Sequence, residues 1–232
     1  VDYFSVRKYE EDSSFTIGCG ISMNGATSLH LPKKNISVRF RGAYGQAELD
    51  YDVFDGGITE FTNLTIRSGQ DYYSAIIRDV LSEDLCLELS DSVVTQRSKF
   101  CILYVNGEYR GIYALKDKSN EQLYASLAGV SKESVSLIKA PVYSDTPLYN
   151  DVIGFALSND MSDPDNYSAI CRNLDVDSLI DWIIMEGYTC NSDLWLGNVS
   201  FCMSDENDGR WHLVFYDLDC SFLSQNENFS NL

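Results

Sequence analysis

The chain has 232 residues, a formal net charge of −18 at pH 7 and 44% hydrophobic residues. This size and composition predict a globular protein with a sizeable hydrophobic core. So acidic a surface repels polyanions, which argues against nucleic acid as a partner and requires any nucleotide site to bring its own cations or metal. The sequence contains no run of 18 apolar residues, so we expect no membrane span.

The termini and the cysteines add little about function. The first residues, VDYFSVRKYEEDSS, resemble a strand or an arm rather than a signal peptide. The chain starts without Met, which fits the trimming of an upstream leader. Its seven cysteines form no CxxC pair and no zinc spacing, and several lie within apolar runs, so we expect buried free thiols.

The first half is rich in predicted strands. Residues 36–40 (ISVRF) and 64–67 (LTIR) gather β-branched residues and predict strands. Residues 73–89 change to a helical period, and their apolar positions are expected to form one buried face: Ile76, Ile77, Val80, Leu81, Leu85 and Leu89.

A hairpin follows this helix. The strand-like run FCILYV is joined to EYRGIYAL by Asn106-Gly107, and Asn-Gly between two such runs favours a tight type I′ turn. We expect this hairpin to be structural, with Gly107 at positive φ and with Tyr104, Tyr109 and Tyr113 packing or lining the region between two lobes.

The second half is mixed. Residues 120–129 and 151–160 predict helices, 135–139 a strand, 141–150 a loop, and Pro164 a break. Asp175 or Asp177 caps a strong helix, SLIDWIIMEGY, which is expected to end near Gly187. Two more strands are predicted at 199–203 and 211–216. This order predicts an α+β fold in one bilobal domain, with a β-rich N-lobe over about 1–118 and a helix-led C-lobe over about 119–232.

Residues 188–219 carry the most informative pattern. Asp193 and Asn198 have the spacing D-x-x-x-x-N, which in kinase catalytic loops lets the aspartate face a substrate hydroxyl and the asparagine face a metal. Asp217 and Asp219 follow an apolar strand, where hard oxygen ligands suit Mg²⁺ or Mn²⁺ rather than zinc. If the backbone stays extended, Asp219 points to the same side as Asp217. Alternatively, these residues only cap and turn a loop.

Four stretches together resemble one family, the spore coat protein H (CotH) kinase family of atypical, mostly secreted protein kinases. The likeness spans roughly residues 20–222. Its stretches are ISMNGATSLHLPKKNISVRF, FTNLTIRSGQDYYSAIIRDVL, LYVNGEYRGIYAL, and the region from LIDWIIMEGY to the Asn-x-Asp, Gly-Asn and Asp-x-Asp motifs. The last two are the most specific.

The resemblance implies a role for each residue that matches a family motif. Asp193 corresponds to the catalytic-loop aspartate, Asn198 and Asp217 hold metal, and Asp219 supports them. Lys33 or Lys34 is implied as the phosphate-contacting lysine. Arg67 and Arg78 are implied either as cations near the phosphates or as partners in surface or interlobe ion pairs.

The chain departs from the family pattern at three positions. Asn24 replaces an expected Arg, Lys116 replaces a common Glu, and Leu218 stands where Trp is about as frequent. The first two changes bear on nucleotide affinity. The chain also ends soon after Asp219, at QNENFSNL, so we expect its C-terminal end to be truncated.

Three functions remain open at this point. The first is a protein kinase that transfers the γ-phosphoryl group of ATP, with Mg²⁺ or Mn²⁺, to Ser or Thr of a coat or extracellular protein. The second is an inactive kinase-like scaffold, which the charge of −18 and the residues Asn24 and Lys116 favour. The third is a kinase-like fold that acts on a small molecule or glycan. For the first two, the resemblance implies a secreted, cell-surface or spore-coat location.

Overall fold

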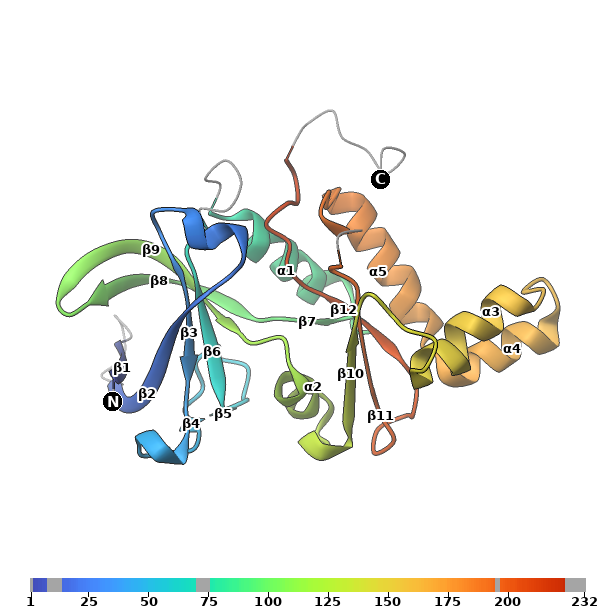
Figure 1. The fold of residues 1–232 in the computed structure, drawn as a ribbon, viewed down its shortest axis with the longest axis horizontal. Coiled ribbons are helices and arrows are strands. Elements are labelled where there is room, and N and C mark those ends of the chain that lie inside the picture. The colour runs from blue at the N-terminus through green and yellow to red at the C-terminus, as the bar shows by residue number, and fades with distance from the viewer. Residues whose placement is uncertain (1, 8–13, 70–75, 195–196, 224–232) are drawn as a thin grey trace. The chain divides into compact units, whose positions relative to one another are not determined.

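The computed structural model describes residues 2–7, 14–69, 76–194 and 197–223. These residues form a mixed α+β fold with five α-helices and a curled antiparallel sheet, as the sequence predicts (Figure 1). Contacts divide the chain into two compact units, one of residues 1–80 and 97–118 and one of residues 81–96 and 119–232. Each unit has its own sheet and its own hydrophobic core.

The first unit is built on a six-stranded antiparallel sheet with the order β1-β2-β3-β6-β9-β8. Its strands are β1 (Asp2–Arg7), β2 (Ser14–Asn24), β3 (Asn35–Arg39), β6 (Asn63–Arg67), β8 (Ser98–Val105) and β9 (Glu108–Asp117). Two short strands, β4 (Leu49–Asp50) and β5 (Glu60–Phe61), pair with each other. The two strands predicted from β-branched residues are confirmed as β3 and β6, whose Val38, Leu64 and Ile66 enter the core.

The hairpin β8–β9 turns at Asn106 and Gly107, whose φ values of 53° and 79° are those of the predicted type I′ turn. Tyr104 and Tyr109 face each other across the strands with ring centroids 5.8 Å apart, and both are largely exposed. Tyr113, in contrast, is buried in the core of the first unit.

Helix α1 (Arg78–Leu89) buries only part of the predicted apolar face: Val80 is buried and Leu85 packs against the core of the second unit. The apolar spacing predicts burial of Leu81 and Leu89, but these side chains are 42% and 68% exposed. The buried positions are mostly polar: Asp79, Val80, Ser82, Glu83 and Cys86. Residues 76–77 form a turn, and residues 73–75 of the predicted helix lie outside the described residues.

The physical reason for the burial of polar positions beside that face lies in Asp79. Its carboxylate pairs with the ammonium of the buried Lys116 on β9 and lies 3.6 Å from Nε of Arg67 on β6. A buried carboxylate needs such partners, because removal from water otherwise costs several kcal/mol. The charge contacts therefore outweigh the apolar spacing of the helix.

The second unit holds a four-stranded sheet with the strand order β10-β11-β12-β7. In this sheet β12 and β7 run parallel to each other. Its strands are β10 (Val135–Lys139), β11 (Ser200–Ser204), β12 (His212–Phe215) and β7 (Val94–Thr95). Strand β12 is buried on both faces: Leu213 and Phe215 join one core cluster, and Val214 joins another with Tyr124. Burial on both faces explains the continuous apolar run in its sequence.

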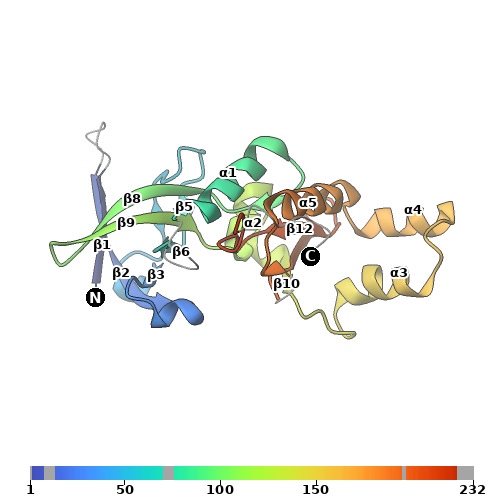
Figure 2. The ribbon, with the colours of Figure 1, turned by 90° about the horizontal axis from the view of Figure 1, so that it is seen from above.

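Helix α5 (Val176–Thr189) packs against β12 through Trp182 and Met185, and helix α2 (Glu121–Ala128) contributes Tyr124 to the cluster with Val214. A short π-helical turn (Tyr149–Ile153) leads into α3 (Gly154–Ser158), and α4 (Pro164–Asn173) follows. Figure 2 shows α3 and α4 as a pair that extends beyond the end of α5.

One detail of these helices differs from the prediction, and another decides between two alternatives that the sequence left open. Pro164 begins α4 rather than only ending the helix before it, because its missing N–H costs nothing at the first helical position and Asp163 caps the helix. Between the two proposed caps of α5, Asp175 is the one whose carboxylate accepts the Ser178 N–H, at 2.8 Å. All seven cysteines are free, and Cys19, Cys86, Cys202 and Cys220 are buried.

Candidate active site

The site begins where α5 ends. Thr189 is the last helical residue, and Cys190 adopts the left-handed conformation with φ of 47°, its N–H bonded to the carbonyl of Glu186. Asn191 is fully buried, and its side-chain oxygen accepts the backbone N–H of Asp193 at 3.3 Å. This short side chain bonding to the backbone two residues on fixes the start of the loop.

The two ends of the D-x4-N pattern are in direct contact. The side-chain amide of Asn198 donates to a carboxylate oxygen of Asp193 at 3.0 Å and to the Asp193 carbonyl at 3.3 Å. The Asn198 N–H also bonds to the carbonyl of Leu194. These bonds use the amide nitrogen of Asn198 and leave its side-chain oxygen for another partner.

The Asp-x-Asp segment runs beside this loop. Ser192 N–H bonds to the carbonyl of Cys220 at 3.4 Å, and Phe222 N–H bonds to that of Thr189 at 2.8 Å. Asp217 has a φ of 61°, which is uncommon for a residue other than glycine and often marks a turn or a functional site. The expectation that Asp217 and Asp219 point to one side assumed an extended backbone, and this conformation does not meet that condition.

Three of the carboxylates act electrostatically on one thiol. The pKa of Cys220 is raised to about 12, first by burial and then by the negative charges of Asp219, Asp193 and Asp217. The pKa of Asp193 is likewise raised, chiefly by desolvation and additionally by Asp217, while the bond from Asn198 opposes the rise. Asp193 thus contacts Asn198 and is acted on by the charge of Asp217, and Asp219, the fourth residue of the predicted site, acts with both aspartates on Cys220.

A buried acid lies behind the loop. Glu186 of α5 is 1% exposed, and burial raises its pKa to about 8, an effect that the neighbouring Asn191 side chain partly opposes. At neutral pH such a group is largely protonated. The sequence signal for this residue is weak, since a Glu inside an amphipathic helix is ordinarily solvent-exposed.

The donor set suits a hard divalent cation. Carboxylate and amide oxygens are the ligands that Mg²⁺ and Mn²⁺ prefer. Desolvation is the main cause of the raised pKa of Asp193, and the negative charge of Asp217 adds to it; a cation bound there would relieve that repulsion. Asn198, Asp217 and Asp219 are the residues that would hold it.

The predicted phosphate cations belong to the first unit, and the two lysines both bond to main-chain carbonyls. Lys33 donates to the carbonyls of Ser68 and Ile112 at 2.8 and 2.7 Å, and its ammonium lies 4.3 Å from the ring centroid of Tyr113. Lys34 donates to the carbonyl of Leu29 at 2.7 Å and to that of the nearby Leu31. These bonds give both side chains a structural role in their own unit.

The two arginines differ. Arg67 lies 3.6 Å from Asp79 and so matches the ion-pair alternative that the sequence left open. Arg78 is the first residue of α1 and is half-buried. Lys116, which departs from the family pattern, pairs with the same Asp79. Asn24, another departure from that pattern, ends β2 opposite Asn35 of β3.

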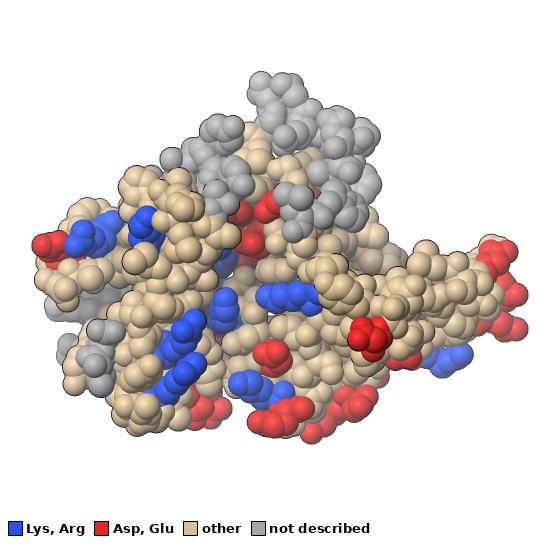
Figure 3. All heavy atoms as spheres, in the orientation of Figure 1, with Lys and Arg blue, Asp and Glu red and all other residues tan. Residues whose placement is uncertain are grey.

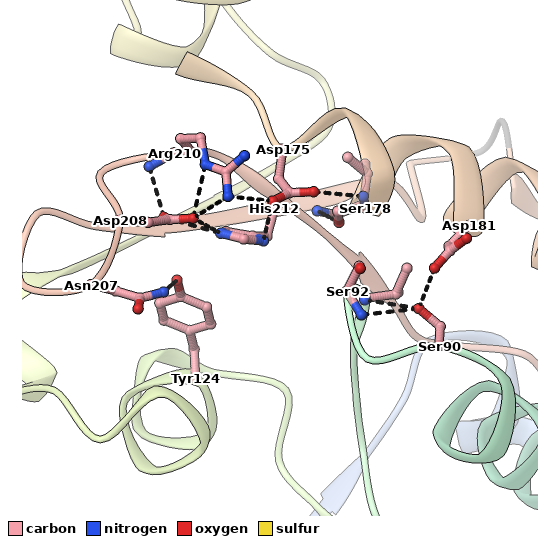
Figure 4. A network of polar contacts seen from close by, with 12 residues as sticks. Ser90, Ser92, Tyr124, Asp175, Ser178, Asp181, Asn207, Asp208, Arg210 and His212 are labelled. Atoms are coloured by element: carbon pink, nitrogen blue, oxygen red, sulfur yellow. Dashed lines mark hydrogen bonds and ion pairs between the residues drawn. The ribbon is translucent and has the colours of Figure 1, made fainter. Parts of the chain in front are cut away.

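Sequence reasoning missed one cluster of possible metal ligands. Asp175, Asp208 and His212 each offer a ligand atom, all within 4.8 Å of one another. Arg210, however, already pairs with Asp175 at 2.7 Å and with Asp208 at 2.9 Å, as Figure 4 shows. With Asp175 also capping α5, this cluster is a charge network that joins the β11–β12 turn to the start of α5.

The chain matches a model of a known protein family. The model of the CotH family, described as CotH kinase protein, matches residues 21–152 and 145–232. The chain therefore belongs to the CotH kinase family. This match confirms the resemblance drawn from its motifs. No curated protein matches the chain. Among the described residues, no helix has the length and apolarity needed to cross a membrane.

Proposed function

We propose that this protein is an atypical protein kinase that transfers the γ-phosphoryl group of ATP to a Ser or Thr hydroxyl, with Mg²⁺ or Mn²⁺. The observation that carries the proposal is the contact of Asp193 with Asn198 beside Asp217, in a chain that matches the CotH kinase family almost throughout. The proposal includes a bilobal kinase-like fold, with an N-lobe over about 1–118 and a C-lobe over about 119–232.

Asp193 is proposed to act on the acceptor. Its carboxylate orients the hydroxyl and takes up the proton as the hydroxyl oxygen forms its bond to the γ-phosphorus. The bond from that phosphorus to the β–γ bridging oxygen breaks, and ADP leaves with the bonding electrons. The amide of Asn198 holds one carboxylate oxygen of Asp193, so the aspartate is oriented before substrate arrives.

Asn198 and Asp217 are proposed to hold the divalent ion, with Asp219 in support. When bound, the ion supplies positive charge to the phosphates. Lys33, Lys34, Arg67 and Arg78 remain proposed phosphate contacts, and for both lysines and Arg67 that role requires release of the contacts described above. The proposed substrate is a coat or extracellular protein, and the proposed location is outside the cell, at a cell surface or in a spore coat.

The experiment is incubation of the purified protein with γ-labelled ATP and Mg²⁺ or Mn²⁺, with detection of label on the protein itself and on an added casein-type acceptor. We expect labelling that requires the metal and is lost in Asp193→Asn. Asp205→Asn, which changes an exposed acid in the β11–β12 turn, serves as the matched control and should label normally.

An inactive scaffold is the second candidate, because the acidic residues are distributed unevenly. By sequence, the second unit has 22 Asp and Glu residues against four Lys and Arg, whereas the first unit has 13 of each. A net charge of that size opposes the binding of ATP unless metal and local cations offset it. Wild-type protein that binds no nucleotide with any divalent ion would establish the scaffold.

A further inference from the structure

The second unit is strongly acidic and has few basic residues that could contact a phosphate group. Lys132, Lys139, Arg172 and Arg210 are its four Lys and Arg residues. Figure 3 shows acidic side chains gathered at the tip of the α3–α4 pair, with few basic ones on the same part of the visible face. A phosphate group bound in this unit would therefore depend on whichever cation lies near it.

Three of the four cations are placed elsewhere. Arg210 is paired with Asp175 and Asp208. Arg172 is exposed in the last turn of α4, and Lys132 is exposed at the start of the 3₁₀ turn Lys132–Ser134.

Lys139 lies beside both parts of the candidate site. It ends β10, where it pairs with Ser200, two residues beyond Asn198. The N–H of the next residue, Ala140, bonds to the Val199 carbonyl at 2.8 Å. The Lys139 ammonium lies 4.7 Å from the ring centroid of Tyr216, the residue before Asp217.

The electrostatics agree with this position. Desolvation lowers the pKa of Lys139, while the negative charges of Asp217 and Glu121 oppose that change. By surface area, Lys139 is nevertheless an exposed residue, so the desolvation is only partial. An ammonium group that is partly stripped of water but still reachable gains more from an anionic ligand than a fully solvated one does.

We propose that Lys139 contacts the phosphoryl groups of the nucleotide whose metal is held by Asp217. The inference rests on the proposed function and places a phosphate-binding cation in the same unit as Asp193, Asn198 and Asp217. It also gives Tyr216 a role, since its ring holds the lysine stem and ammonium in place through a cation–π contact. If Lys139 were only a counter-ion for Asp217, it would compete with the metal and add nothing to nucleotide binding.

These two roles predict opposite effects, which calorimetry separates. We would titrate wild type, Lys139→Met and the matched control Lys132→Met with Mn²⁺ alone, then with ATP in the presence of Mg²⁺. Met keeps the length and packing of the lysine stem on Tyr216. We expect Lys139→Met to bind Mn²⁺ as tightly as wild type or more tightly, since a positive charge is gone, yet to bind ATP about tenfold or more weakly. Lys132→Met should match wild type within about twofold.

Each outcome decides something. Unchanged or stronger ATP binding by Lys139→Met, in a wild type that does bind ATP, overturns this inference and leaves the proposed kinase function intact. A wild type that binds no nucleotide overturns both. Lys139→Arg tests the charge requirement if Lys139→Met has a lowered melting temperature, because Arg keeps the positive charge and should retain most of the ATP affinity.

Discussion

The side-chain oxygen of Asn191 accepts a hydrogen bond from the backbone N–H of Asp193 at 3.3 Å. Asn191 is completely buried, whereas Asp193 is partly exposed. A buried side chain beneath the loop thus sets the backbone position of the proposed catalytic residue. The loop geometry therefore depends on a residue that itself contacts no substrate.

Asn191→Ala should accordingly lower turnover and stability together while leaving metal affinity nearly unchanged. Loss of a buried hydrogen-bonding side chain costs about 1–3 kcal/mol of the free energy of unfolding. Urea denaturation, turnover and Mn²⁺ titration measure the three effects. Asn207→Ala, which removes a longer bond to the hydroxyl of Tyr124 in the β11–β12 turn, is the control. Full activity in Asn191→Ala would show that the Asp193 backbone is held by other contacts.

The sequence predicted those parts of the fold whose local signals agree with the tertiary contacts. The Asn106-Gly107 turn, β3, β6 and the long helix α5 belong to this group, because turn chemistry, β-branched residues and helical spacing each act locally. Helix α1 was predicted as a helix, but only part of its predicted apolar face is buried, and Leu81 and Leu89 are exposed. The pairing of Asp79 with Lys116 decides its orientation, and no local pattern encodes a contact between residues 37 positions apart.

The candidate site shows the same division. Spacing and family motifs pointed to Asp193, Asn198, Asp217 and Asp219, since these residues carry a recognisable pattern. Lys139 and Glu186 carry none. Lys139 comes next to Tyr216 only through the pairing of β10 with β11 and of β11 with β12, and Glu186 becomes unusual only through its burial.

Gly107→Val should destabilise the protein through backbone strain alone. Gly107 has a φ of 79°, and no heavy atom lies within 4 Å of the position that a Cβ would occupy. Any loss therefore reflects the left-handed conformation, which costs a β-branched residue roughly 1–3 kcal/mol. A lower melting temperature is the expected readout. Asn106→Gly, at the other positive-φ position, should be tolerated, and an unchanged melting temperature for Gly107→Val would contradict the type I′ assignment.

Stability should fall with rising pH because of Glu186. Its pKa rises from 4.5 to about 8 on folding, so between these values the folded protein keeps a proton that the unfolded chain has released. The contribution is fully present below about pH 4.5 and is lost as the pH approaches 8, at up to about 1.4 kcal/mol per pH unit. Urea denaturation of wild type and Glu186→Gln from pH 5 to 9 measures it.

Glu186→Gln should show a flatter dependence on pH and should be the more stable protein at pH 8, because Gln stays neutral throughout. Glu88→Gln, an exposed position on α1, is the control and should follow wild type. Parallel pH curves for wild type and Glu186→Gln would mean that Glu186 is ionised in the folded protein.

Asp193 and Asp217 should fail in different ways when each is changed to Ala. Asp217 is proposed to hold the metal, so its loss should weaken metal-dependent ATP binding. Asp193 is proposed to act on the acceptor hydroxyl, so its loss should lower turnover by about 10²- to 10⁴-fold and leave most of the ATP affinity in place. The difference arises because ground-state binding depends on phosphate and metal contacts, while the catalytic aspartate acts chiefly in the transition state.

Both variants should remain folded, and removal of one of several clustered carboxylates should raise stability slightly in the absence of metal. Calorimetry with ATP and Mg²⁺ separates the two roles, with Asp205→Ala as an exposed-acid control. If Asp193→Ala loses ATP binding as completely as Asp217→Ala, then Asp193 itself holds the metal and the division of roles within the site is wrong.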